Sequence, residues 1–374
     1  MSLIIHYSFI INHHLIMDYN VIWYIIIGLL LIGYAILDGF DLGVGALHLL
    51  SKGDTNRRIM LNSIGPVWDG NEVWLITAGG ALFAAFPEVY ATAFSGFYLP
   101  FMLLLIALIF RAVSIEFRSK EPSKRWRSTW DTGFSLGSII AAILFGIAIG
   151  NVVVGFAIDA SKVHQGSFLD LISPYTLLTG FFNLAMFTMH GAMYLNLKTQ
   201  GDLQAQVQRW AKNAYLVFLI MFTITTAATL YLQPTMIANF SFGLADVPGE
   251  SHELVRQHQT LVSVVAWLIV ILNVLSIANI PRALAKDKPM QGFISSACTI
   301  TAIVLLFALG IFPNMLVSNL SPDFNIDIYN GSSSQYTLRT MFWVAIWGLP
   351  FVIGYTSLIY WTYRGKTELN ESSY

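Results

Sequence analysis

The chain has 374 residues, of which 56% are hydrophobic and only 11% are charged, and its formal net charge is −1. Soluble domains carry about 25% charged residues, so this chain has too few charges to cover a water-facing surface. The composition therefore indicates an all-α, polytopic membrane protein, and the near-neutral charge argues against a nucleic-acid partner. A single cysteine, Cys298, excludes an internal disulfide, a CxxC redox pair and a cysteine-ligated iron–sulfur cluster.

The first 16 residues contain no Lys or Arg and no small-residue cleavage site, so they fit a secretory signal poorly. Met17 begins a second plausible start, Met-Asp-Tyr. Residues 1–16 are interpreted either as a genuine extension or as the result of a mis-assigned start codon. Residues 17–374 are expected to form a single transmembrane domain.

Nine stretches are long and apolar enough to span a bilayer, which takes roughly 20 apolar residues per helix. Their expected bounds are about 21–49, 59–85, 88–116, 130–156, 170–197, 209–233, 259–280, 291–315 and 338–363. Long connections near 233–259 and 312–338 suggest two four-helix groups followed by one helix. No internal repeat is evident.

The distribution of Lys and Arg predicts the orientation, since these residues favour cytoplasmic loops. They cluster after the first, third, fifth, seventh and ninth predicted helices, whereas the opposite loops contain only Lys162, Arg256 and Arg339. This alternation predicts an N-terminus outside and a C-terminus in the cytoplasm.

The second predicted helix contains an unusual stretch, residues 65–86, with two carboxylates about one turn apart. Asp69 and Glu72 are expected at depths of roughly 16 and 20 Å from the cytoplasmic side. A carboxylate inside a bilayer costs at least about 2.5 kcal/mol and therefore usually marks a proton or ion path or a buried pair. Asp69 has no cation within one turn on its own helix, which favours a proton-conducting role over a structural one. Trp74 is expected to be a packing residue.

A second polar group is predicted from the first and third helices. Asp38 and Asp41 are three residues apart, share a helix face and are expected roughly 13–18 Å deep. Arg111 is expected roughly 9 Å deep near the cytoplasmic end of the third helix, and its side chain is long enough to pair with either of them. These residues are interpreted as a polar cluster that either pins the helices together or relays protons. Gly39 and Gly43 form a small-xxx-small pair that permits close helix approach.

The histidines offer little cofactor chemistry. His48 lies at a helix end, where an imidazole interacts favourably with the helix dipole. His190 lies deep in the fifth helix among methionines, and a hydrogen-bonded or packing role is favoured over haem ligation, because no second deep histidine could complete a pair of ligands. No metal site is predicted on this chain.

Several long motifs carry a resemblance to one family. The stretches DGFDLGVGALHLL, DTNRRIMLNSIGPVWDGNEVWLITAGGALFAAFPEVYATAFSGFYLPFMLLLIALIFR and WDTGFSLGS resemble subunit II of cytochrome bd quinol oxidases. The match is dense over residues 18–135 and continues in helix count and in the SSSQYTL segment before the last helix. It lacks only the first 16 residues, which favours Met17 as the start.

The resemblance implies a subunit of a quinol:dioxygen oxidoreductase of the respiratory chain. Two b-type haems and one d-type haem would belong to subunit I, the partner in a pseudo-symmetric heterodimer. Other implied partners are small single-helix subunits, lipid, and the substrates quinol and dioxygen. In some members subunit II holds a structural quinone.

At the residue level, the resemblance implies that Asp69 begins a proton pathway toward haem d and that Trp74 lines an oxygen route. Asp38 and Asp41 match the DGFDxGVG motif, with a relay or structural role. Some members have Gln at the position of Glu72, so no essential role is expected there. Two other functions stay open: an ion-coupled transporter, although no inverted repeat supports it, and a purely structural assembly subunit.

Overall fold

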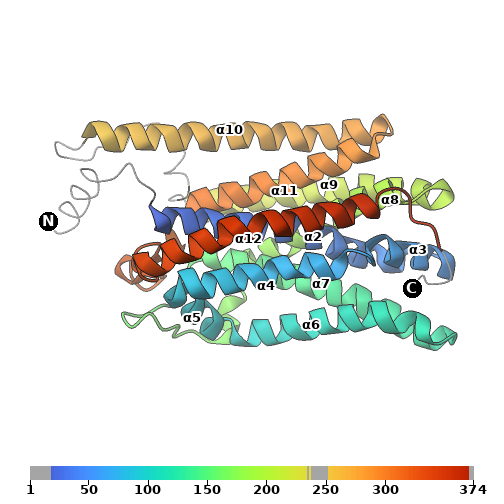
Figure 1. Ribbon diagram of the computed structural model, residues 1–374, viewed down its shortest axis with the longest axis horizontal. Helices are drawn as coiled ribbons and strands as arrows, with labels where there is room; N and C mark the ends of the chain where they lie inside the picture. The colour runs from blue at the N-terminus through green and yellow to red at the C-terminus, as the bar shows by residue number, and fades with distance from the viewer. Residues whose placement is uncertain (1–17, 234–235, 237–251, 370–374) are drawn as a thin grey trace.

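The computed structural model describes residues 18–233, 236 and 252–369, and the predictions made for residues 1–17 lie outside this part. Long helices run side by side along the molecule (Figure 1). They are α2 (Tyr19–Leu47), α3 (Asp54–Ile64), α4 (Trp68–Ala85), α5 (Pro87–Gly96), α6 (Tyr98–Phe117), α7 (Lys124–Val154), α8 (Pro174–Lys198), α9 (Gly201–Leu232), α10 (His252–Ala285), α11 (Pro289–Ile311) and α12 (Gln335–Thr362). Short 3₁₀ turns are η1 (His48–Leu50), η2 (Arg118–Lys120), η3 (Phe168–Leu171) and η5 (Pro322–Phe324). The all-α membrane fold is confirmed.

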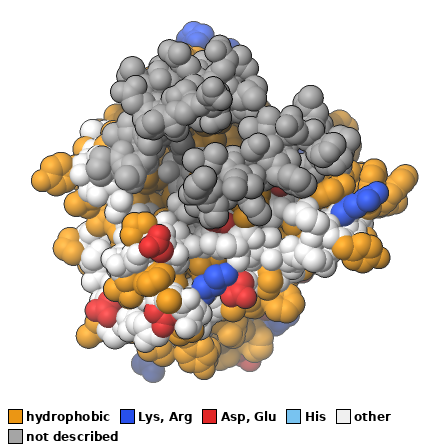
Figure 2. Space-filling model, turned by 90° about the vertical axis from the view of Figure 1, so that its left-hand side faces the viewer, with side chains coloured by type: hydrophobic (Ala, Val, Ile, Leu, Met, Phe, Trp, Pro, Cys, Tyr) orange, Lys and Arg blue, Asp and Glu red, His pale blue; other side chains and the backbone are white. Residues whose placement is uncertain are grey.

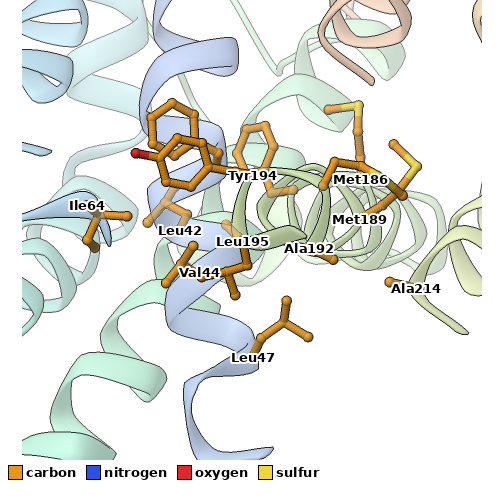
Figure 3. Close-up of a cluster of buried hydrophobic side chains, with 14 of the residues drawn as sticks. Leu42, Val44, Leu47, Ile64, Met186, Met189, Ala192, Tyr194, Leu195 and Ala214 are labelled. Atoms are coloured by element: carbon orange, nitrogen blue, oxygen red, sulfur yellow. The ribbon is translucent and has the colours of Figure 1, made fainter. Parts of the chain in front are cut away.

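Helix α2 is the centre of the bundle, because it packs against α4, α7, α8 and α11. Its glycines permit the closest approach: a Cβ placed on Gly43 would lie 1.9 Å from the carbonyl oxygen of Phe187 in α8. Gly191 of α8 faces the same point from the other side. The expected small-residue contact is therefore confirmed. Side chains from α2 and α8 fill the space around it, among them Leu42 and Tyr194 (Figure 3).

The second predicted helix, 59–85, is wrong as a single element. It is two helices, α3 and α4, separated by a turn in which the Val67 amide donates to the carbonyl of Ile64. Pro66 lies in the break, and because it has no N–H to donate, it cannot continue the hydrogen-bond series of α3. The backbone leaves the helical conformation at Val67. The third predicted helix, 88–116, is likewise divided into α5 and α6 around Phe97.

Seven described helices are long and apolar enough to cross a membrane, namely α2, α6, α7, α9, α10, α11 and α12. Helices α4 and α8, which were predicted as spans, fall outside this set. Helix α8 nevertheless has 25 residues and packs between α7 and α9. The prediction of nine spans and its orientation stay predictions.

One end of the bundle carries the longer loops. There β1 (Asn314–Leu316) pairs antiparallel with β2 (Ile326–Asp327), and the Phe156 amide donates to the carbonyl of Val317. Figure 2 views the molecule from this side, where acidic and basic side chains are scattered among uncharged ones. The flanks of the bundle are apolar instead: Ile76, Trp347 and Phe351 are each more than 70% exposed. Such surfaces suit lipid or a partner subunit.

Candidate functional site

A buried ion cluster joins α2, α4 and α6. Arg111 forms a two-pronged contact with Asp38, with Nη2–Oδ1 and Nη1–Oδ2 distances of 2.5 and 3.1 Å. Its Nη1 also donates to Glu72 at 2.9 Å, and its Nη2 lies 3.9 Å from Asp41. Arg111, Asp38 and Asp41 are fully buried, while the Glu72 side chain is 24% exposed. Three carboxylates thus share one guanidinium.

The structure brings Asp38, Asp41 and Arg111 together. Their relay or structural role stays a prediction. Glu72 joins them through its ion pair with Arg111, although no essential role was expected for it. The glutamine that some family members have at this position does not indicate an ion pair with Arg111.

Two uncharged residues extend this cluster, and both were missed in the sequence. Asn71 Nδ2 donates to Asp41 Oδ2 at 2.7 Å, and the Tyr360 hydroxyl donates to Asn71 Oδ1 at 2.8 Å. Tyr360 comes from α12, 289 positions away in the sequence. Asn71 directly precedes Glu72 in the WDGNEVW motif, and that position was the only available signal.

Asp69 lies apart from the cluster. It is in the first turn of α4 and is exposed, and its side chain makes no hydrogen bond or ion pair in the described part of the chain. The depth expected for Asp69 assumes one continuous helix. That depth is wrong because the helix is broken at Pro66. Glu72, three residues further along α4, connects the same helix to Arg111.

The Trp74 ring packs directly on the backbone of α2. A Cβ on Gly33 would lie 2.3 Å from the ring, so only glycine leaves room for the indole there. Trp74 is half-buried. This contact is of the packing kind that the sequence predicted for Trp74. The oxygen route stays a prediction.

A second polar network was missed entirely. Asp131 of α7 accepts from Arg118 at 2.5 Å, contacts His48 at 2.6 Å and accepts from Arg57 at 2.8 Å. Arg118 also donates to Asp54, which accepts from Arg127. The network ties η1 after α2, η2 after α6 and the N-terminal part of α7 to the start of α3. No sequence pattern reveals it, because His48 and Asp131 are 83 positions apart.

His190 is not placed to bind haem iron. Its Nδ1 lies 2.7 Å from the Ser296 hydroxyl and its Nε2 lies 3.0 Å from the carbonyl oxygen of Ile36. The ring also stacks on Phe293. Since both nitrogens are engaged, the hydrogen-bonded interpretation is confirmed, and His190 does not fit a haem.

Comparison with known proteins decides the family. The family described as cytochrome bd terminal oxidase subunit II matches residues 19–363. The chain is 38% identical over 364 residues to cytochrome bd-I ubiquinol oxidase subunit 2 of Escherichia coli, with 93% of this chain and 96% of the relative covered. This chain belongs to the cytochrome bd terminal oxidase subunit II family.

Further relatives agree with this assignment. The subunit II chain is 32% identical over 351 residues to cytochrome bd ubiquinol oxidase subunit 2 of Bacillus subtilis, covering 94% of this chain and 97% of that one. Its fold matches a chain in the structure of bd oxidase from Geobacillus thermodenitrificans, with a TM-score of 0.71, 17% identity, and coverage of 92% and 98%.

Subunit II membership settles several expectations. The chain is a subunit of a haem-containing terminal oxidase and has a subunit I as its partner. It is a multi-pass protein of the bacterial cytoplasmic membrane. The transporter interpretation finds no support.

Proposed function

We propose that this chain supplies protons from the cytoplasm to the site of oxygen reduction in its oxidase complex. The complex would oxidise a quinol and reduce dioxygen to water, with the two b-type haems and the d-type haem on subunit I. Reducing dioxygen to water consumes one proton for every electron, so a site buried in the membrane needs a polar route. Small additional subunits and a structural quinone on this chain are part of the same proposal.

One observation carries the proposal. The exposed side chain of Asp69, which has no partner in the described chain, is followed one turn later by Glu72. Glu72 pairs with the fully buried Arg111, which in turn pairs with Asp38. Carboxylates placed in series from surface to interior form a path on which a proton binds and leaves in steps. The fixed positive charge of Arg111 keeps the buried carboxylates from accumulating unbalanced negative charge.

The test uses Asp69→Asn in the complete complex, reconstituted into liposomes. We expect slower quinol oxidase turnover and slower generation of membrane potential, while the haem spectrum is unchanged. Asp202→Asn is the matched control, since Asp202 is also exposed and also lies in the first turn of a helix, α9. Normal turnover with normal membrane potential in Asp69→Asn would remove the pathway role and leave a structural subunit.

The oxygen route is a separate proposal. The Trp74 ring forms part of the surface between α2 and α4, and its contact with Gly33 leaves little free space beside it. Replacement by a smaller side chain in Trp74→Ala should alter the rate of oxygen binding measured by flow-flash spectroscopy. An unchanged rate would leave Trp74 as a packing residue.

A further inference from the structure

A cavity of about 500 Å³ lies at the end of the bundle that the charge distribution assigns to the cytoplasm. Its walls come from the end of α3, the end of α8, the end of α12 and the segment that follows α12, and include Asn62, Lys198 and Tyr360. The segment after α12 closes one side. It is held because Lys198 Nζ donates to the carbonyl of Tyr363 and the Thr367 amide donates to the carbonyl of Lys198.

This cavity reaches the buried cluster through two hydrogen bonds. Tyr360 lines the cavity and donates to Asn71, and Asn71 donates to Asp41. Asn71 is 2% exposed and Asp41 is fully buried. Only the side chains of Tyr360 and Asn71 therefore separate the cavity from the buried carboxylate of Asp41. This route does not pass through Asp69.

Asp41 is the least neutralised carboxylate of the cluster. Arg111 bonds directly to Asp38 and Glu72, whereas its nearest approach to Asp41 is 3.9 Å. The second oxygen of Asp41, Oδ1, has no hydrogen-bond partner in the described chain. A buried carboxylate oxygen without a partner is costly unless water or a proton reaches it.

We propose that this cavity is a water-filled proton inlet to Asp41, with Tyr360 and Asn71 as its gate. The inference rests on the proposed proton-supplying function and adds a second entrance to it. An amide does not pass a proton along, so the Tyr360–Asn71 hydrogen bond must open and admit water. The proton then moves from that water to the carboxylate of Asp41, which becomes neutral, and continues into the cluster. The groups that face Asp41 are Asp38, Glu72, Arg111, Tyr194 and Tyr360.

The first test blocks the cavity chemically. Thr367 lines it, and Cys298 is the chain's only cysteine. Thr367→Cys is made in a Cys298→Ala background, and the complex in liposomes reacts with a charged, membrane-impermeant methanethiosulfonate. We expect labelling to slow turnover and proton uptake several-fold. Glu121→Cys, on an exposed loop away from the cavity, is the labelled control and should keep its rate. Full proton uptake by labelled Thr367→Cys would overturn the inlet.

The second test concerns the gate. Asn71→Leu removes the hydrogen bond to Asp41 and fills the space with an apolar group, so proton uptake should slow several-fold while the haem spectrum stays intact. Asn71→Ser is smaller and leaves room for a water, so it should restore uptake. If Asn71 had only a structural role, both substitutions would slow proton uptake. That result would contradict the role of Asn71 in the gate.

The two entrances are separated by repeating the Thr367→Cys labelling in an Asp69→Asn background. If Asp69→Asn slows proton uptake and the label adds nothing, the inlet fails while the proposed function stands. If the label slows uptake and Asp69→Asn alone does not, the inlet stands and the role of Asp69 fails. If neither change has an effect, both proposals are lost.

Discussion

At the scale of single residues, Arg111 determines whether the buried cluster of carboxylates is stable. Its guanidinium contacts both oxygens of Asp38 and one oxygen of Glu72, and all its neighbours among the described charges are acidic. Burying several carboxylates around one cation is stable only while that cation is present. Asn71 and Tyr360 add neutral hydrogen bonds that a charge count does not include.

Arg111→Gln should therefore destabilise the complex strongly. Removing one partner of a buried ion pair costs about 3–5 kcal/mol, because the remaining charges are left unbalanced. Thermal unfolding of the purified complex, followed by the loss of haem absorbance, should show a lower midpoint. Arg125→Gln is the control, because Arg125 is exposed. A midpoint equal to that of the unmodified complex would show that the cluster tolerates loss of its cation.

Some residue contacts could be predicted from the sequence and others could not. Asp38, Asp41 and Arg111 were grouped correctly because intramembrane charges are rare and must pair. The contacts of Tyr360 and Asp131 were not found. A tyrosine in an apolar helix has no distinguishing pattern, and Asp131 lies close enough to a predicted helix end to suggest only a solvated carboxylate.

At the scale of helices, close packing between α2 and α8 depends on glycine. The backbones meet where Gly43 faces Phe187 and Gly191, and a methyl group has no room there. The sequence predicted the glycine pair from its four-residue spacing, although it could not identify α8 as the partner. Spacing gives the face of a helix but not which helix covers it.

Gly43→Ala should force α2 and α8 apart. Overpacking a tight core costs about 1–3 kcal/mol, and here the added carbon would lie 1.9 Å from a carbonyl oxygen. The expected result is less assembled complex in membranes and a lower unfolding midpoint. Gly28→Ala on the same helix is the control, since no atom lies within 4 Å of the added Cβ. Equal assembly of both variants would contradict the close contact.

The loop of residues 155–173 should respond to pH. Burial lowers the pKa of His164 below its usual 6.5, an effect only partly opposed by Asp170. The folded loop thus favours the neutral imidazole. The stability of the loop is therefore greatest above pH 6.5 and decreases as the pH falls, because the unfolded loop then binds a proton more readily than the folded loop does. Backbone amides that bond to Asp159 and Asp170 lower the pKa of both carboxyl groups, and these contributions are lost at still lower pH.

Hydrogen exchange in the purified complex measures this effect. After correction for intrinsic exchange, the amides of Val163 and Gln165 should be less protected at pH 5.5 than at pH 7.5, because they bond within the loop. His164→Asn removes the titrating group and should abolish the difference. Equal protection of the unmodified loop at both pH values would show that His164 does not control it.

At the scale of the whole molecule, hydropathy alone predicted the all-α membrane fold and approximate positions for most helices. It did not predict the breaks at Pro66 and Phe97, because a hydropathy window averages over a short turn. Hydropathy also could not predict how the helices are arranged in space. Helix α12 follows α11 in the sequence, but it packs against α2 and α4. That placement brings Tyr360 to Asn71 and so creates the wall between the cavity and the cluster.

The orientation of the whole chain is the last prediction. Lys and Arg concentrate at the end of the bundle that holds η1, η2 and the end of α12, which should face the cytoplasm. A fluorescent protein fused after Glu368 should therefore fluoresce, while alkaline phosphatase fused at the same position should be inactive. Phosphatase fused after Gln165, in the opposite loop, should be active. The reverse pattern would invert the chain and move the proposed proton inlet to the outer face, which would contradict uptake from the cytoplasm.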